Sequence, residues 1–317
     1  MLIFSTISYD YLQKEIIIKN NLRTRLPLIV AGNLETKIFP DGESYHKMED
    51  VSGQKVLLIG GTTTDSETLE LYDMACHIAK TGAESLTIII PYYGYSTMER
   101  AVKPGELVKG KTRARLLSSI PNVCPIKIMF MDLHCEGIPH YLEGNIQPTH
   151  LYGKKLIIKM CKNLIGDNEF VLASTDAGRA KWVESLANEM GVECAIITKR
   201  RISGTDTEIA GINADVKDKD VVIYDDMIRT GGSLMKAGKA YLNAGAKNVY
   251  AVATHGVFPN DSLFQLKASG IFKSIATTDT HPRSNELTGM PSLEGFYKVY
   301  TIAELLSDYI IEHYRTN

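Results

Sequence analysis

Two adjacent carboxylates followed by a glycine-rich turn are the strongest chemical signal in this 317-residue sequence. Between an apolar run and a helical pattern lie Asp225, Asp226, Met227, Ile228, Arg229, Thr230, Gly231, Gly232 and Ser233. Two glycines allow a phosphate to approach the backbone closely, and consecutive N–H groups at a helix N-terminus can bind it. The paired acids would hydrogen-bond the two hydroxyls of a ribose whose 5-phosphate fills this cradle. A solvated turn uses the same residue types, but the position between strand and helix favours a ribose-phosphate site.

Other polar segments also follow short apolar runs. They are Asp132-Leu133-His134, Thr175-Asp176-Ala177-Gly178 and Lys199-Arg200-Arg201. In open parallel sheets, ligands bind beyond the carboxyl ends of the strands, so these segments are candidates for chemistry. Taken alone, a histidine after a strand is more often packed or capping, and three adjacent cations usually form a solvated face.

The elements that must position these residues form an internal repeat. Each copy has an apolar run, a polar loop, a helical pattern, a Gly-Ala dipeptide and another apolar run. The first copy has apolar runs at 56–59 and 86–90 around a helical pattern at 67–80; the second has runs at 221–224 and 249–252 around a helical pattern that ends near 242. Short apolar runs alternating with helices predict parallel sheets covered on both faces. We therefore expect two duplicated α/β domains that join tightly near residues 145–155, rather than a chance likeness of unrelated units. Helical spacing from Ile302 to Tyr314 predicts a final helix packed on a core.

Composition excludes several classes of protein. With 44% hydrophobic and 23% charged residues the chain is globular, and a net charge of −2 gives no general attraction for nucleic acid or an anionic membrane. We expect neither a membrane span nor a signal peptide. Five cysteines without CxxC spacing argue against a disulfide framework or structural zinc. We expect a cytoplasmic enzyme that binds anions at a local site.

The acidic and glycine-rich segment is similar to the phosphoribosyl-binding signature of the type I phosphoribosyltransferase fold. The whole chain resembles the ribose-phosphate pyrophosphokinase family through further segments in family order: Phe39-Pro40-Asp41-Gly42-Glu43, Pro91-Tyr92-Tyr93-Gly94-Tyr95, Lys103-Pro104-Gly105-Glu106 and the three polar segments above. The resemblance implies two phosphoribosyltransferase-like domains, each a parallel sheet flanked by helices. Residues 1–148 would be the ATP-side domain and residues 149–317 the phosphoribosyl-binding domain. The implied reaction transfers the diphosphoryl group of ATP to the anomeric hydroxyl of ribose 5-phosphate.

Roles for individual residues also follow from the resemblance. His134 and Asp176 would surround a complex of Mg²⁺ and ATP, with His134 also taking part in catalysis. Lys199 and Arg201, the first and third members of a mobile catalytic loop, would close on the transferring phosphates. Phe39, Asp41 and Glu43 would form a hairpin that holds the adenine of a neighbouring subunit's ATP, which implies a homo-oligomer, a dimer or a hexamer.

Two departures from the family pattern bear on specificity. Where members carry Arg-Gln-Asp, this chain has Thr97-Met98-Glu99. The Arg-Gln pair of the family contacts ATP, and Arg100 would replace that contact only in part. Arg229 stands where most members have an acid, and a cation there favours an acceptor with more negative charge. A diverged enzyme that uses ADP-ribose, a non-catalytic regulatory paralogue and a phosphoribosyltransferase remain alternatives. The last of these shares only the loop at 225–233.

Overall fold

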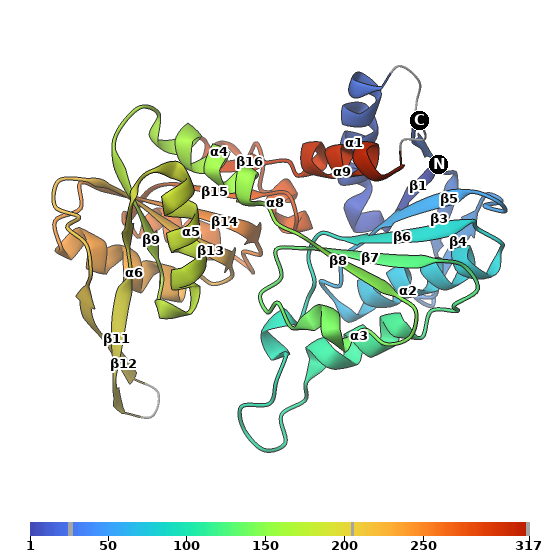
Figure 1. Cartoon of the computed structure of the whole chain (residues 1–317), viewed down its shortest axis with the longest axis horizontal. Coiled ribbons are helices and arrows are strands. Elements are labelled where there is room, and N and C mark those ends of the chain that lie inside the picture. The colour runs from blue at the N-terminus through green and yellow to red at the C-terminus, as the bar shows by residue number, and fades with distance from the viewer. Residues whose placement is uncertain (25–27, 204–205, 315–317) are drawn as a thin grey trace. The chain divides into compact units, whose positions relative to one another are not determined.

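Two compact units of the described chain each contain a six-stranded parallel sheet (Figure 1). The computed structural model describes residues 1–24, 28–203 and 206–314, with the backbone alone for 199–203 and 206–210. The first unit comprises Met1–Tyr152 and the chain end from Thr301, and the second comprises Gly153–Tyr300. No helix in the described ranges is long and apolar enough to cross a bilayer.

The first unit has the strand order β2-β1-β5-β6-β7-β8, with every neighbouring pair parallel. Its strands are β1 (Leu2–Ser5), β2 (Val30–Ala31), β5 (Lys55–Ile59), β6 (Ser85–Ile90), β7 (Ile126–Met131) and β8 (Gln147–Leu151), and a separate antiparallel hairpin pairs β3 (Leu34–Ile38) with β4 (Ser44–Met48). Its helices are α1 (Asp10–Arg23), α2 (Asp65–Lys80), α3 (Lys109–Ser118) and α9 (Ala303–Tyr314). Val56 and Leu58 of β5 pack in one core with Leu71 of α2, while Leu57 and Ile59, which alternate with them, are also buried. Burial of alternate residues on both faces explains the unbroken apolar run in the sequence.

The second unit has the order β10-β9-β13-β14-β15-β16, again parallel throughout. Its strands are β9 (Phe170–Ser174), β10 (Glu193–Ala195), β13 (Asp220–Ile228), β14 (Asn248–Gly256), β15 (Phe272–Thr278) and β16 (Tyr297–Tyr300), and β11 (Ile197–Ser203) pairs with β12 (Asp206–Ile212) in a hairpin that projects from this unit. Its helices are α4 (Lys154–Ile165), α5 (Ala180–Met190), α6 (Gly232–Asn243), α7 (Ser262–Ala268) and α8 (Pro282–Glu286). Val221 and Ile223 of β13 pack in a core with α6, whereas Val222 and Tyr224 pack in another with α4 and α5. β13 is therefore covered by helices on both of its faces.

The predicted duplication is confirmed by the two sheets. In both units the first two strands are neighbours at one side, a hairpin follows, and the remaining four strands then add in sequence order. The repeat read from the sequence corresponds to β5–α2–β6 and β13–α6–β14. The family resemblance predicted a hairpin at Phe39 to Glu43, which corresponds to β3–β4, whereas the β11–β12 hairpin was not predicted.

The two units divide between Tyr152 and Gly153, close to the boundary expected after residue 148. Helix α4 begins at Lys154, directly after β8, without an intervening linker. The chain end differs from the expectation that 149–317 form one domain, because α9 contacts α1 of the first unit. Ile302, Leu306 and Ile310 are buried there, in agreement with the helical spacing.

Candidate active site

The paired acids lie inside a strand, which corrects the expectation that they occupy a loop. β13 continues to Ile228, so Asp225 and Asp226 are part of the sheet and Asp225 pairs along β14. β9 ends earlier, at Ser174. Because β13 extends beyond its neighbour, the two acids lie beside the segment that leaves β9.

That segment contacts both acids. The hydroxyl of Thr175 donates to Oδ2 of Asp225 at 3.2 Å, and Nη2 of Arg179 lies 2.8 Å from Oδ2 of Asp226. Asp226 is almost fully buried, with 5% of its side chain exposed. Burial, and then the neighbouring carboxylate of Asp226, raise the pKa of Asp225 well above its usual range. The pair therefore attracts groups that neutralise or hydrogen-bond a carboxylate.

Asp176 lies in the same segment. Its Oδ1 accepts the N–H of Gly178 at 2.9 Å and caps the one-turn helix Ala177–Arg179. This turn carries the guanidinium that pairs with Asp226. Asp176 is half-buried. The structure therefore places Asp176, Asp225 and Asp226 at the carboxyl ends of two neighbouring strands, β9 and β13.

The expected phosphate cradle follows the same strand. Arg229 and Thr230 are exposed, and Gly231 has a φ of 77° directly before α6 begins at Gly232. A Cβ on Gly231 would approach the side chain of Leu266 to 2.7 Å, so both the backbone conformation and the packing require glycine. Gly232 and Ser233 form the first turn of α6, where N–H groups lack partners within the helix. This geometry suits an anion.

A buried polar layer supports the neighbouring strand ends. Nδ1 of His255 lies 2.8 Å from the hydroxyl of Thr280, and the hydroxyls of Thr278 and Thr280 donate to the carbonyl of Thr254 at 2.6 and 3.1 Å. Asp279 and His255 form an isolated bridge between the segments. The Thr278-Asp279-Thr280 segment thus holds the end of β14, the strand that pairs with β13.

His134 belongs to the first unit, in the loop after β7, and is half-buried. The backbone turns at Asp132, which has a φ of 37° and donates its N–H to the carbonyl of Leu151 at 3.0 Å. The next N–H, of Leu133, donates to Nε2 of His150 at 3.0 Å. Two residues of β8 therefore hold the turn that precedes His134. Asp176, the other expected metal ligand, belongs to the second unit.

The segment Phe39 to Glu43 forms the turn of the β3–β4 hairpin. The N–H of Phe39 donates to the carbonyl of Glu43 at 2.8 Å, and Oδ1 of Asp41 accepts the N–H of Glu43 at 3.1 Å. Gly42 has a φ of 92°. The ring of Phe39 meets that of Tyr45 edge to face and remains 45% exposed. The hairpin therefore presents an aromatic surface at its tip.

Arg100 is highly exposed and its nearest acid is Glu99, with 3.4 Å between Nε and Oε1. It follows the short helix Ser96–Met98 that contains two of the unusual residues. Close by in sequence, Tyr95 donates its hydroxyl to Oδ1 of Asp65 at 2.5 Å. Arg113 donates to the same carboxylate oxygen at 2.5 Å.

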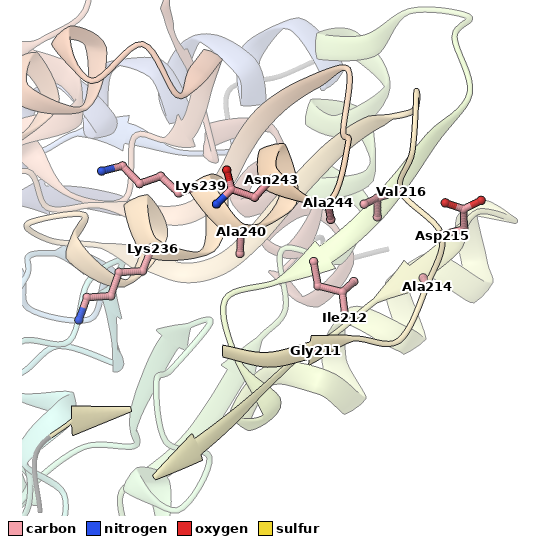
Figure 2. Close-up of a pocket in the computed structure, with 10 residues that line it drawn as sticks. All are labelled: Gly211, Ile212, Ala214, Asp215, Val216, Lys236, Lys239, Ala240, Asn243 and Ala244. Carbon is pink, nitrogen blue, oxygen red and sulfur yellow. The ribbon is translucent and has the colours of Figure 1, made fainter. Parts of the chain in front are cut away.

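Lys199 and Arg201 lie in β11, paired with Ile209 and Thr207 of β12, so they belong to a hairpin strand and do not follow a strand as predicted. Their side chains are outside the described part of the structure. A groove of about 580 Å³ lies between the base of this hairpin and α6, and Figure 2 shows its lining residues. Lys236 and Lys239 come from α6, while Gly211 and Ile212 come from the hairpin. Among the predicted site residues whose side chains the structure describes, none lines it.

Sequence reasoning missed Arg179 and His150, and it assigned no role to Thr175 although it singled out the segment that contains this residue. Arg179 directly follows the Thr-Asp-Ala-Gly segment, so a search for a cation to pair with two adjacent acids would have found it. His150 gives no such signal, since its partner is a backbone N–H whose direction depends on the turn at Asp132. Among the described residues, no group of three or more His, Cys, Asp or Glu side chains is arranged to hold a metal ion.

Comparison with known proteins shows to which family this chain belongs. Residues 1–120 match the N-terminal domain of ribose phosphate pyrophosphokinase, and residues 146–264 match the phosphoribosyl transferase domain. The chain belongs to the ribose-phosphate pyrophosphokinase family. The ribose-phosphate pyrophosphokinase of Chlorobaculum tepidum is 34% identical over 245 residues, which are 76% of this chain and 74% of the relative. That of Campylobacter jejuni is 33% identical over 273 residues, 84% of each chain.

A solved structure supports the fold of this ribose-phosphate pyrophosphokinase family member. The crystal structure of phosphoribosylpyrophosphate synthetase from Mycobacterium smegmatis superposes with a TM-score of 0.81 and 24% identity, covering 98% of this chain and 97% of that chain. The expected fold, two phosphoribosyltransferase-like domains with parallel sheets flanked by helices, is thereby confirmed.

Proposed function

We propose that this protein transfers the diphosphoryl group of ATP to the anomeric hydroxyl of ribose 5-phosphate, giving phosphoribosyl pyrophosphate and AMP. The proposal rests on family membership over both domains. One structural observation supports it for this chain: two adjacent carboxylates lie near the carboxyl end of β13, and a glycine-rich turn and a helix N-terminus follow that strand. A sugar diol and its terminal phosphate have the spacing and charge that this arrangement recognises.

In this mechanism the second unit holds the acceptor. Asp225 and Asp226 hydrogen-bond the ribose hydroxyls, while the backbone and hydroxyls from Thr230 to Ser233 bind the 5-phosphate. Arg179 already contacts Asp226 and keeps that carboxylate in place. Arg229 is exposed beside the cradle and adds positive charge for the phosphate.

The ATP side combines charge and positioning. The carboxylate of Asp176 would help to hold Mg²⁺ together with substrate oxygens, because it is half-buried, offers the oxygen ligand that Mg²⁺ prefers, and Mg²⁺ keeps several non-protein ligands. The family resemblance implies His134, in the other unit, as its partner around the complex of Mg²⁺ and ATP. When bound, the ion would neutralise charge on the transferring phosphates. Lys199 and Arg201 add the compact charge and the planar fork that phosphate oxygens accept. Arg100 would contact the nucleotide.

The hairpin tip supports a homo-oligomer, a dimer or a hexamer. Phe39 is 45% exposed and Ile38 is 71% exposed, next to the carboxylates of Asp41 and Glu43. An aromatic ring with adjacent hydrogen-bond acceptors suits the adenine of a neighbouring subunit's ATP. The site would then be complete only in the assembly.

Measuring AMP release tests the proposal. The purified protein is incubated with Mg²⁺ and ATP, together with either ribose 5-phosphate or ADP-ribose. We expect AMP and phosphoribosyl pyrophosphate with ribose 5-phosphate. Release of AMP with ADP-ribose alone would instead assign an acceptor with a second phosphate, and no release with either would contradict a catalytic role.

A further inference from the structure

The turn that presents His134 depends on a side-chain acceptor from the edge strand. β8 is the last strand of the first sheet, and its ladder with β7 ends at the pair Met131 and Leu151. Asp132 extends the ladder by one N–H bond to the carbonyl of Leu151. The next residue, Leu133, is 4% exposed and points its N–H back toward β8.

A buried N–H without an acceptor is costly, so Leu133 needs a partner. Nε2 of His150 accepts this N–H at 3.0 Å and replaces the carbonyl that a longer ladder would supply. The ring of Tyr152 lies 4.2 Å from the imidazole, centroid to centroid, at 36°. The hydroxyl of Tyr152 donates to Oε1 of Glu136, in the loop after β7, at 3.5 Å. The imidazole is thus held between its own strand and the loop after β7.

The bond also defines the state of the ring. Nε2 can accept this hydrogen bond only in the neutral tautomer that carries the ring hydrogen on Nδ1. Burial lowers the pKa of His150 below its usual value, against an opposing effect of Glu136. Neutral His150 is therefore a stable acceptor for the backbone.

We propose that His150 is a positioning residue for the reaction, which fixes the backbone at Leu133 and thereby aims the side chain of His134. This inference rests on the proposed function of His134. His150 acts through a main-chain bond one residue away from the group it aims, so its loss would misplace His134 while the ribose-phosphate residues of the second unit remain unchanged. A small misplacement of a reacting group lowers turnover strongly.

Two substitutions at the same position separate the acceptor from the volume of the ring. His150→Gln retains an oxygen that can accept the N–H, whereas His150→Leu keeps comparable bulk without an acceptor. We expect kcat of His150→Leu to fall by roughly 10- to 100-fold with little change in KM for ribose 5-phosphate. His150→Gln should recover most of the turnover. His77→Leu, which removes an exposed histidine of α2, is the matched control and should behave like the natural protein.

Amide hydrogen exchange supplies a readout that does not depend on activity. Faster exchange at residues 132–135 in His150→Leu, but not in His150→Gln, would support the positioning role. Full turnover in His150→Leu, or an equal loss in both variants, would overturn it. Inactivity of the natural protein would contradict the proposed function instead, and the exchange comparison would still test the bond to Leu133.

Discussion

At the residue scale, the adjacent acids of β13 are suited to bind ribose, but their burial side by side lowers the stability of the ligand-free protein. Asp225 is half-buried beside Asp226, and burial together with that carboxylate raises its pKa, so it holds a proton more readily than a free aspartic acid does. Asp226 differs because Arg179 pairs with it. A ribose that donates hydroxyl hydrogens to both carboxylates would offset the cost of holding these two acids side by side.

The first prediction concerns the pH dependence that Asp225 introduces. The folded pKa lies above the unfolded one, so the folded state holds the proton more tightly and stability falls as pH rises from about 4 toward the raised pKa. Asp225→Asn should therefore raise the melting temperature of the ligand-free protein at pH 7, with a smaller gain near pH 4. Added ribose 5-phosphate should stabilise the variant less than the natural protein.

Asp226→Asn is the contrasting variant. It leaves Arg179 without its carboxylate, so we expect a lower melting temperature at pH 7. A destabilised Asp225→Asn protein at that pH would contradict the raised pKa of Asp225, which burial and the neighbouring carboxylate cause.

The second prediction concerns the cations of β11. Lys199→Ala should lower kcat by roughly 10²–10³-fold, because a contact that stabilises developing charge on the phosphates is removed. The affinity for ribose 5-phosphate, measured by calorimetry without ATP, should stay close to normal. Arg200→Ala, the middle residue of the run, serves as the control, and near-normal turnover of Lys199→Ala would remove this lysine from the mechanism.

At the element scale, the equivalent helices of the two units show how the duplicated sites have diverged. α2 begins with Asp65, whose carboxylate accepts from Tyr95 and Arg113, so an internal anion occupies the positive end of this helix. α6 begins with Gly232 after a left-handed Gly231 and carries no acid in its first turn. Of these two helix starts, α6 is the one whose charge suits an external phosphate.

Gly231 yields the third prediction. Gly231→Ala would place a Cβ 2.7 Å from the side chain of Leu266 at a φ of 77°, so we expect a loss of about 1–3 kcal/mol in the free energy of unfolding. Affinity for ribose 5-phosphate should fall as well, because the turn before α6 must shift. Gly289→Ala, at a φ of 76° with open space around the Cβ, measures the backbone cost alone. Equal losses in the two variants would show that packing against Leu266 is unimportant.

These elements also mark what sequence can predict. Unbroken apolar runs and Gly-Ala steps gave the parallel strands and their repeat because burial on both faces leaves a direct pattern. The extension of β13 through two carboxylates could not be read in this way, since its support comes from hydrogen bonds to β14 and from Arg179. Likewise, the bond between His150 and Leu133 depends on the backbone turn at Asp132.

At the scale of the whole molecule, the chain end returns to the first unit. α9 contacts α1, and Arg23 of α1 forms ion pairs with Glu304 and Asp308 of α9. Helical spacing predicted that this segment packs on a core, but the same apolar stripe would suit either sheet. The placement therefore depends on the tertiary contacts between α1 and α9 rather than on the local pattern.

The fourth prediction follows from that placement. Ile310 is 1% exposed, so Ile310→Ala should lower the free energy of unfolding of the first unit by about 2–4 kcal/mol through lost burial and the cavity left behind. Hydrogen exchange measured by mass spectrometry should show lost protection in α1 and α9, with α6 of the second unit unchanged. Glu312→Ala, an exposed change in the same helix, should leave protection as it is. Because α9 follows β16 directly in the sequence, a loss of protection confined to the second unit would instead mean that the chain end stabilises the domain it leaves.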